Sequence, residues 1–234
     1  NWDTFTETAK AISELSSGDN KIVGAGMSGW WANWLVWINA AANNGRNNYF
    51  NEDRTGCGLN QQATTDAFNF LSNIYSNGWA VPFGSDPEAP FVAGTVGMFM
   101  NGRWATPGVR TVDFEWDVVE LPAGPSGTAG NWLFWGAYVI NANTEHPEEA
   151  WALAQALTTA QTQGKISALG ANIPSRVSQE ALDAFLTFTP PANNQAFLNG
   201  IAADANPTAE GPLWAGSWPE FDKVMGPAIQ GVLT

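Results

Sequence analysis

PEAPFVAGTVGMFMNGRW, residues 87–104, sets three kinds of local structure side by side. Pro87 lies near the first turn of a short helix that the pattern predicts over residues 87–93. TVGMFMNG then has the apolar character of a buried strand that runs into a tight turn. Arg103 and Trp104 begin a second short helix. A strand held between two helices is typical of an α/β protein.

The same alternation continues on both sides of this stretch. Residues 1–15 predict a helix with Asn1 as its N-cap, and residues 21–26 predict a short strand. Apolar residues at helical spacing predict further helices at 28–43, 62–77, 147–160, 163–169, 179–186, 193–203 and 219–233. Two more strands are expected, at residues 114–122 and 134–142. The chain therefore reads as an α/β fold rich in helices.

Composition restricts the ligand. The 234 residues are enough for one large domain or two small lobes. Charged residues make up only 13% of the chain, so Asn, Gln, Ser, Thr and Gly must form much of the polar surface. The net charge is −13, which repels nucleic acid and anionic lipid head groups. We expect a neutral or cationic ligand and no nucleic-acid partner.

The chain has one cysteine and one histidine, which limits its chemistry. Cys57 can form neither an internal disulfide nor a cysteine-based zinc site, and a small residue in a Gly-bounded turn is its expected role. His146 stands just before a predicted helix with no nucleophile nearby. We expect no metal and no cofactor. No apolar run approaches the length of a membrane span.

SGWWANWLVW, residues 28–37, holds four tryptophans. On a helical wheel Trp30, Trp34 and Trp37 share one face, and Trp31 heads an adjacent apolar stripe. Together the two stripes are wider than the face that one core contact requires. We expect part of this helix, Trp37 included, to be core and one or two rings to face a cleft.

Six phrases in chain order carry a family resemblance: NWDTFTETAKAI, SGWWANWLVWINAAANNG, PFVAGTVGMFMNGRW, WDVVELPAGPSG, WGAYVINANTEHPEEAW and ANIPSR. They resemble the family 1 extracellular solute-binding proteins, the maltose-binding-protein-like sugar-binding components of ABC importers. Gly97, Ala137 and Glu145 depart from the usual Ala, Gly and Lys of that pattern.

The resemblance implies a periplasmic-binding-protein type II fold and a non-catalytic function. Two lobes would close by hinge motion around a neutral sugar or oligosaccharide, and a membrane permease would receive it. The expected organisation is a C-terminal lobe at 1–133 and 171–234, with 134–170 crossing to the N-terminal lobe, most of which the fragment would lack. The resemblance also implies a monomer with an extracellular or periplasmic location, a lipid anchor being one form of it.

The resemblance also suggests site residues. Trp104 corresponds to the main sugar platform, Trp34 to a stacking aromatic, and Trp218 to a third aromatic for which Trp214 is the competing choice. Further candidates are Trp30 and Trp31 at the cleft mouth, Trp135 beside Gly136 at the lobe crossover, and Asn101 and Arg103 as polar contacts. Arg103 could reach a sugar hydroxyl or pair with an acid. The remaining tryptophans are assigned to packing: Trp2, Trp79, Trp116, Trp132 and Trp151.

Two other functions remain open on the sequence. A glycoside hydrolase needs two carboxylates about 5–10 Å apart, and Glu115, Asp117 and Glu120 could supply them. An all-β carbohydrate-binding module is the other alternative. The strong helical patterns at residues 62–77 and 147–160 argue against it.

Overall fold

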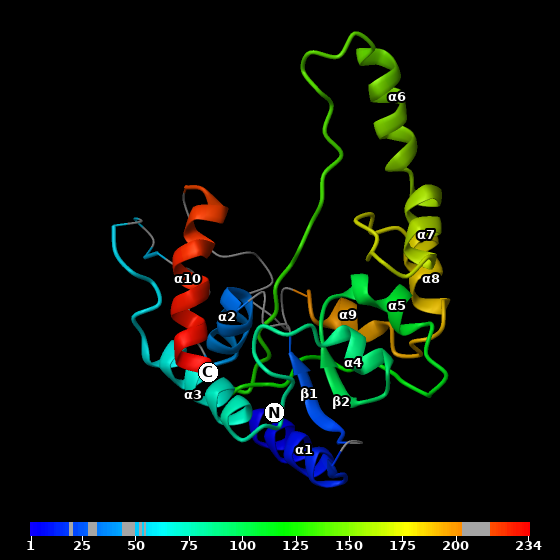
Figure 1. Cartoon of the computed structure of the whole chain (residues 1–234). Coiled ribbons are helices and arrows are strands. Elements are labelled where there is room, and N and C mark those ends of the chain that lie inside the picture. The colour runs from blue at the N-terminus through cyan, green and yellow to red at the C-terminus, as the bar shows by residue number, and fades with distance from the viewer. Residues whose placement is uncertain (19–20, 28–31, 44–49, 52, 54, 203–215) are drawn as a thin grey trace. The chain divides into compact units, whose positions relative to one another are not determined.

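The computed structural model describes residues 1–18, 21–27, 32–43, 50–51, 53, 55–202 and 216–234, and for residues 32–35 and 37 the backbone alone. These residues form two compact units, whose elements are labelled in Figure 1. Unit 1 comprises Asn1–Asn101, Glu120–Leu133 and Asn199–Thr234, and unit 2 comprises Gly102–Val119 and Phe134–Leu198. The division expected from the family resemblance, at residues 133/134 and 170/171, stays a prediction.

Helix α1 (Trp2–Glu14) opens unit 1 with the predicted N-cap. Asn1 Oδ1 accepts a hydrogen bond from the backbone N–H of Thr4 at 2.9 Å, and the Thr4 hydroxyl accepts one from the amino terminus at 2.9 Å. On the buried face of α1, the Ser13 hydroxyl accepts from the backbone N–H of Gly24 at 2.8 Å. This bond ties the helix to the first strand.

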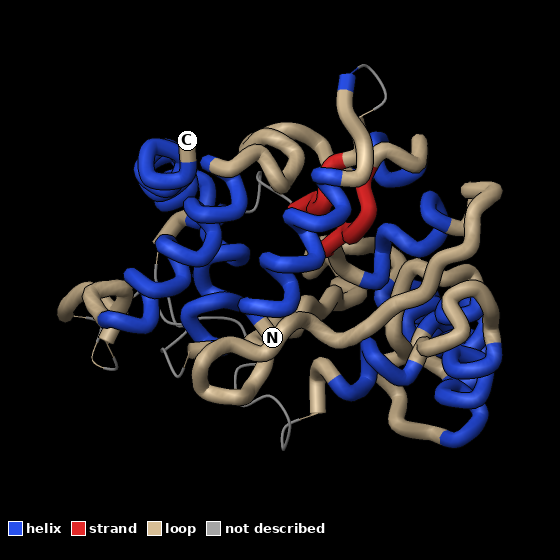
Figure 2. The backbone as a smooth tube through the Cα atoms, turned by 90° about the horizontal axis from the view of Figure 1, so that it is seen from below, coloured by secondary structure: helices blue, strands red, loops and turns tan. Residues whose placement is uncertain are grey.

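Two strands form a parallel sheet in unit 1, as Figure 2 shows in red. Strand β1 (Val23–Met27) pairs with β2 (Val96–Met100), with Val23 opposite Val96 and Met27 opposite Met100. Residues 24–27 of β1 are all buried, as expected of a strand covered on both faces. Helix α4 (Glu88–Val92) leads into β2, so the helix–strand order predicted for residues 87–100 is confirmed.

Three longer helices complete unit 1: α2 (Ala32–Ala42), α3 (Gln62–Ser76) and α10 (Trp218–Leu233). They pack against one another. The buried residues of α3 recur every three or four positions, at Thr64, Ala67, Leu71 and Ile74, which is the spacing of one helical face. The predicted helices at these places are confirmed, with ends within a few residues.

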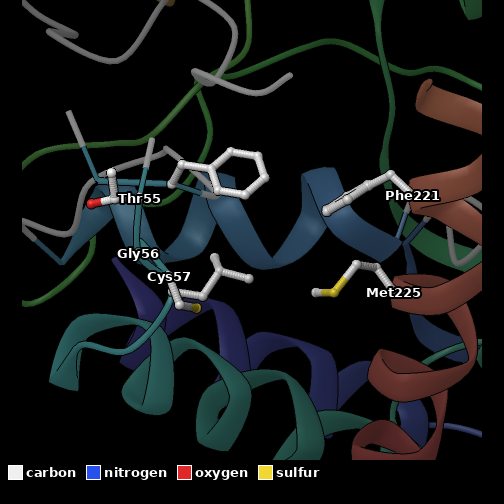
Figure 3. Close-up of a pocket in the computed structure, with 7 residues that line it drawn as sticks. Thr55, Gly56, Cys57, Phe221 and Met225 are labelled. Atoms are coloured by element: carbon white, nitrogen blue, oxygen red, sulfur yellow. The ribbon is translucent and has the colours of Figure 1, made fainter. Parts of the chain in front are cut away.

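A turn within residues 50–57, described at 50–51, 53 and 55–57, lies opposite α10. An antiparallel bridge between Phe50 and Cys57 closes the turn. The side chains of Phe221 and Met225 project from α10 toward it (Figure 3).

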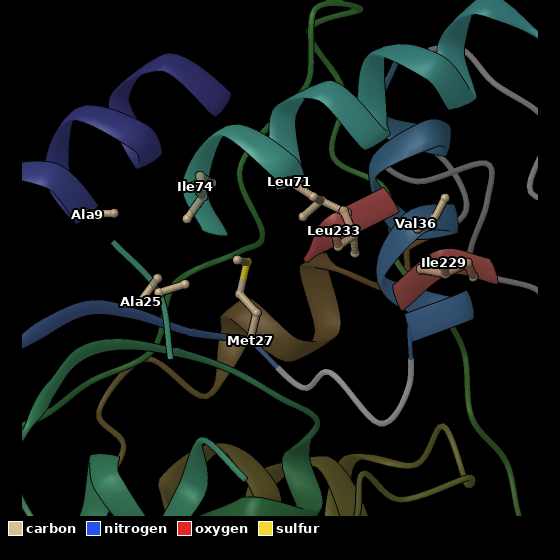
Figure 4. Packing of buried hydrophobic residues seen from close by; sticks show 9 residues of the cluster. Ala9, Ala25, Met27, Val36, Leu71, Ile74, Ile229 and Leu233 are labelled. Carbon is tan, nitrogen blue, oxygen red and sulfur yellow. The ribbon is translucent and has the colours of Figure 1, made fainter. Parts of the chain in front are cut away.

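The core of unit 1 draws on α1, β1, α2, α3 and α10 (Figure 4). Its buried members come from segments far apart in the sequence, so the core fixes these elements to one another. They are Ala9, Ala25, Met27, Val36, Leu71, Ile74, Ala80, Ile229 and Leu233. Beside this cluster Trp2 stacks on Phe70, with ring centroids 4.5 Å apart and the planes 7° from parallel. Its assignment to packing is confirmed.

Unit 2 is helical in the residues described. It contains a 3₁₀ turn η3 (Arg103–Ala105), α5 (Thr106–Val109), α6 (Pro147–Leu157), α7 (Ala160–Ala168), α8 (Gln179–Thr187) and α9 (Gln195–Asn199). Helices α7 and α8 pack together, with Ala181 and Phe185 of α8 fully buried. The side chains of Thr159 and Ser178 cap α7 and α8.

The strands expected at 114–122 and 134–142 are wrong, because the structure gives neither segment regular secondary structure. A strand needs a neighbour to accept its N–H groups and donate to its carbonyls, and no described strand lies beside either segment. Helix α6 has no buried residue. Trp151 on this helix is 56% exposed, so it is not packed within the described part of the chain.

Candidate functional site

Trp104 lies in the 3₁₀ turn that follows β2, and its indole is 37% exposed. Its ring and that of Phe134 form a T-shaped contact, with centroids 5.1 Å apart and the planes 87° from parallel. A side chain at Gly102 would overlap the Trp104 ring, so glycine at that position lets the indole fold back over the backbone. The turn therefore presents a fixed aromatic ring of which about a third is open to solvent.

Arg103 is buried and connects this turn to other residues of unit 2. It is only 4% exposed, and its guanidinium carbon lies 4.9 Å from the Phe185 ring centroid and 5.0 Å from that of Phe197. Nη1 donates to the Thr106 hydroxyl at 3.1 Å. Burial, with a smaller contribution from the charge of Arg110, lowers the pKa of Arg103 to about 10.

No acid among the described residues pairs with Arg103, and its contact with a sugar hydroxyl stays a prediction. Its guanidinium is packed against two aromatic faces, those of Phe185 and Phe197. It acts as a support for the turn that carries Trp104. Phe185 and Phe197, which hold it, were not among the predicted residues, and they lie about 80 to 95 positions further along the chain.

Trp135 and Gly136 lie in the extended segment of unit 2 that follows Phe134. Trp135 is 82% exposed. A side chain built at Gly136 would meet nothing within 4 Å, so the backbone there is open on its surface. Both residues are accessible, and their contact with a ligand stays a prediction.

Trp218 and Asn101 belong to unit 1. Trp218 begins α10 and is half-buried, packed against the core cluster with its ring 5.7 Å from Phe221 and tilted by 41°. Asn101 is half-buried just after the end of β2. Trp218 thus contributes to packing and also keeps part of its surface accessible.

The other predicted aromatics fall outside what the structure describes. Trp34 lies on α2, of which the backbone alone is described at this position. Trp30, Trp31 and Trp214 lie outside the described residues. Their roles as ligand contacts stay predictions.

Two of the three carboxylates considered for glycoside hydrolysis, Asp117 and Glu120, accept hydrogen bonds from neighbouring residues. Asp117 Oδ1 accepts from the backbone N–H groups of Val118 and Asn193, both at 2.9 Å. Glu120 Oε1 accepts from Asn199 Nδ2 at 2.6 Å, and this bond lowers the pKa of Glu120. The lowered pKa of Glu120 is opposite in direction to the raised pKa that a general acid requires.

The described part of the chain contains neither a candidate metal site nor a helix that could span a membrane. No three His, Cys, Asp or Glu side chains come close enough to hold a metal ion. None of its helices is long and apolar enough to cross a membrane.

A family model and the curated relatives of the chain both indicate binding proteins. Residues 1–196 match the family described as bacterial extracellular solute-binding protein. A binding protein of Brucella abortus is 22% identical over 99% of this chain and 55% of its own length. The chain thus spans about half the length of the curated relatives it matches.

Solved structures show the same fold. An ABC substrate-binding protein of Listeria monocytogenes, in complex with cycloalternan, matches with a TM-score of 0.79 at 21% identity, over 100% of this chain and 58% of that one. UgpB of Mycobacterium tuberculosis, in complex with glycerophosphocholine, matches with a TM-score of 0.72 at 19% identity, over 99% of this chain and 56% of that one. The predicted type II periplasmic-binding-protein fold is confirmed.

Proposed function

The chain belongs to the bacterial extracellular solute-binding proteins, and we propose that it binds a neutral sugar or oligosaccharide without changing it chemically. The bound sugar would be delivered to the membrane permease of an ABC importer. The family places the protein outside the cytoplasmic membrane, and a lipid anchor is part of the proposal.

The observation that carries the proposal is the presentation of Trp104. Sugars offer patches of C–H groups that pack on aromatic faces. The Trp104 ring is partly exposed and held in a T-shaped contact with Phe134, while buried Arg103 fixes the turn beneath it. Aromatic rings that are rigid before binding lose little conformational freedom when a ligand arrives.

Charge favours a neutral sugar over a phosphate-bearing solute such as the one in the Mycobacterium tuberculosis complex. The net charge of −13 opposes the approach of anionic groups. The cation nearest to Trp104 in sequence, Arg103, is buried between two phenylalanine rings and does not offer a phosphate its guanidinium fork.

We also propose that residues 134–170 belong to the N-terminal lobe of a longer protein, with 1–133 and 171–234 in the C-terminal lobe. Two observations support this division. Residues 135–142 are all exposed although several are large and apolar, and α6 has no buried residue. Such a surface suits a segment that packs against another part of a protein.

Isothermal titration calorimetry of the intact protein against mono- and oligosaccharides tests the proposal. Trp104→Ala should abolish the heat signal of the sugar that binds, because it removes the aromatic face. Trp151→Ala removes an indole from α6 that is 56% exposed, against 37% for Trp104, and serves as the control, with unchanged affinity. Equal affinity in the wild type and the Trp104 variant would refute the site, and turnover of chromogenic glycosides would refute the non-catalytic function.

A further inference from the structure

Unit 1 contains a pocket of about 340 Å³ between the turn at residues 50–57 and α10 (Figure 3). Among the described residues its lining is aromatic, aliphatic and sulfur-bearing, and none of these lining side chains is charged. The apolar lining residues are Phe50, Cys57, Leu59, Phe221 and Met225. For comparison, an apolar cavity of about 150 Å³ is large enough to hold benzene.

The walls of the pocket are held in place before any ligand arrives. On the turn, Asn51 Oδ1 accepts from the backbone N–H groups of Thr55 and Gly56, both at 2.9 Å. On the opposite wall, α10 is anchored in the core through Ile229 and Leu233. A preformed concave surface of this size is a feature of small-molecule sites.

The residues that line the pocket favour an aromatic ligand over a sugar. Phenylalanine rings favour another aromatic ring at their edges or faces, and the sulfur atoms of Met225 and Cys57 make favourable contacts with aromatic rings. Thr55 supplies the single side-chain hydroxyl among the lining residues. A sugar would leave most of its hydroxyl groups without partners here, and each such group carries a desolvation cost.

We propose that this pocket binds a neutral compound with a single aromatic ring and one small polar substituent. The ring would lie between Phe221 and Met225 on one side and the turn on the other, with its substituent toward Thr55. The overall negative charge excludes anionic aromatics from the preferred class. This site is separate from the sugar-binding proposal and holds or fails without it.

Cys57 provides the assay, because it is the single cysteine of the chain, is exposed and lines the pocket. The rate at which a disulfide reagent modifies Cys57 is measured at increasing benzyl alcohol, with no sugar present. We expect a saturable slowing of at least about fivefold. Half of the effect should occur on the order of 1–10 mM for a ligand of roughly eight non-hydrogen atoms.

Substitutions on α10 locate the effect. Met225→Trp should fill the pocket and abolish the protection, whereas Met225→Leu conserves volume and should retain it. Val224→Trp places the same indole on the exposed face one residue away and should leave the protection unchanged. Circular dichroism checks that each variant is folded.

A second measurement needs no variant. Saturation-transfer NMR should detect benzyl alcohol on the native chain and lose the signal after Cys57 is alkylated with N-phenylmaleimide, whose ring would occupy the pocket. Unsaturable slowing, equal protection in Met225→Trp, or an NMR signal that survives alkylation would each overturn the site. Equal protection by benzoate would overturn the preference for neutral rings.

Discussion

Arg110 joins three segments of unit 2, and its replacement by methionine should loosen all three. Its Nε donates to the Pro190 carbonyl at 2.6 Å, and its two Nη atoms donate to the Ala168 and Phe188 carbonyls, both at 3.4 Å. The guanidinium carbon also lies 4.2 Å from the centroid of the Phe188 ring. One side chain thus holds the end of α7 and the segment that follows α8.

The expected cost of Arg110→Met follows from these contacts. The short bond to Pro190 contributes about 1 kcal/mol, the two longer bonds about 0.5 kcal/mol each, and the aromatic contact about 0.5–1 kcal/mol for a half-buried group. The sum is about 2.5–3 kcal/mol. The methionine fills some of the space left by the arginine stem, so lost polar contacts account for most of the effect.

Hydrogen–deuterium exchange with mass spectrometry measures this locally. A loss of about 2.5–3 kcal/mol raises the opening equilibrium of α7 roughly 60- to 150-fold, seen in peptides that cover residues 160–170. Peptides from α3 in unit 1 should exchange as before. Arg110→Lys keeps the charge but lacks the guanidinium fork, and should recover about a third of the loss.

Arg176→Met is the matched control. Arg176 is exposed and donates through its Nε to a single carbonyl, that of Thr158. Its removal should change exchange less than about threefold, within the small range of surface substitutions. If Arg110→Met exchanges no faster than this control, the three carbonyl contacts do not hold unit 2 together and the reasoning is refuted.

Three further outcomes are expected. Gly97→Ala should destabilise the fold by about 1 kcal/mol, because its Cβ would lie 2.8 Å from two carbons of Ile12. In a double-mutant cycle measured by urea unfolding, Ile12→Val should offset part of this loss, and strictly additive effects would contradict the clash. Burial raises the pKa of Tyr75. Below about pH 10 this side chain is protonated in both the folded and the unfolded state, whereas above it the unfolded state ionises first and the stability of the fold decreases. Tyr75→Phe should remove this alkaline loss in pH-dependent melting, and an identical pH profile would exclude Tyr75 as its source. Arg103→Met should be neutral or stabilising by up to about 2 kcal/mol, because it replaces a buried charge by an apolar chain between two rings. Arg103→Ala should instead destabilise the fold by about 2–4 kcal/mol, because it leaves a cavity. If calorimetry shows a loss of stability in both variants, the charge itself is needed.

Sequence patterns predicted those parts of the fold that are encoded within a few neighbouring residues. The Asn1 cap depends on Thr4, three positions away, and the buried face of α3 repeats along one helix. The glycine at position 97, where the family pattern has alanine, has a long-range explanation instead, since Ile12 fills the space that a methyl group would take. That contact joins residues 85 positions apart and leaves no local signal.

The errors share one physical origin. Residues 134–142 have strong strand propensity, but propensity supplies no partner for the backbone, so the structure contains no strand there. The burial of Arg103 is likewise not predictable from its residue type, because a charged residue is rarely buried. Its burial depends on Phe185 and Phe197, which no pattern within NGRW could reveal.

The extended segment after Phe134 has a practical consequence for handling the chain. FWGAYVI, residues 134–140, contains no charge and no proline, and all seven residues are exposed. Such a run is a ready template for intermolecular β-pairing and aggregation. A gatekeeper lysine introduced as Val139→Lys should therefore raise the concentration at which the purified chain begins to precipitate.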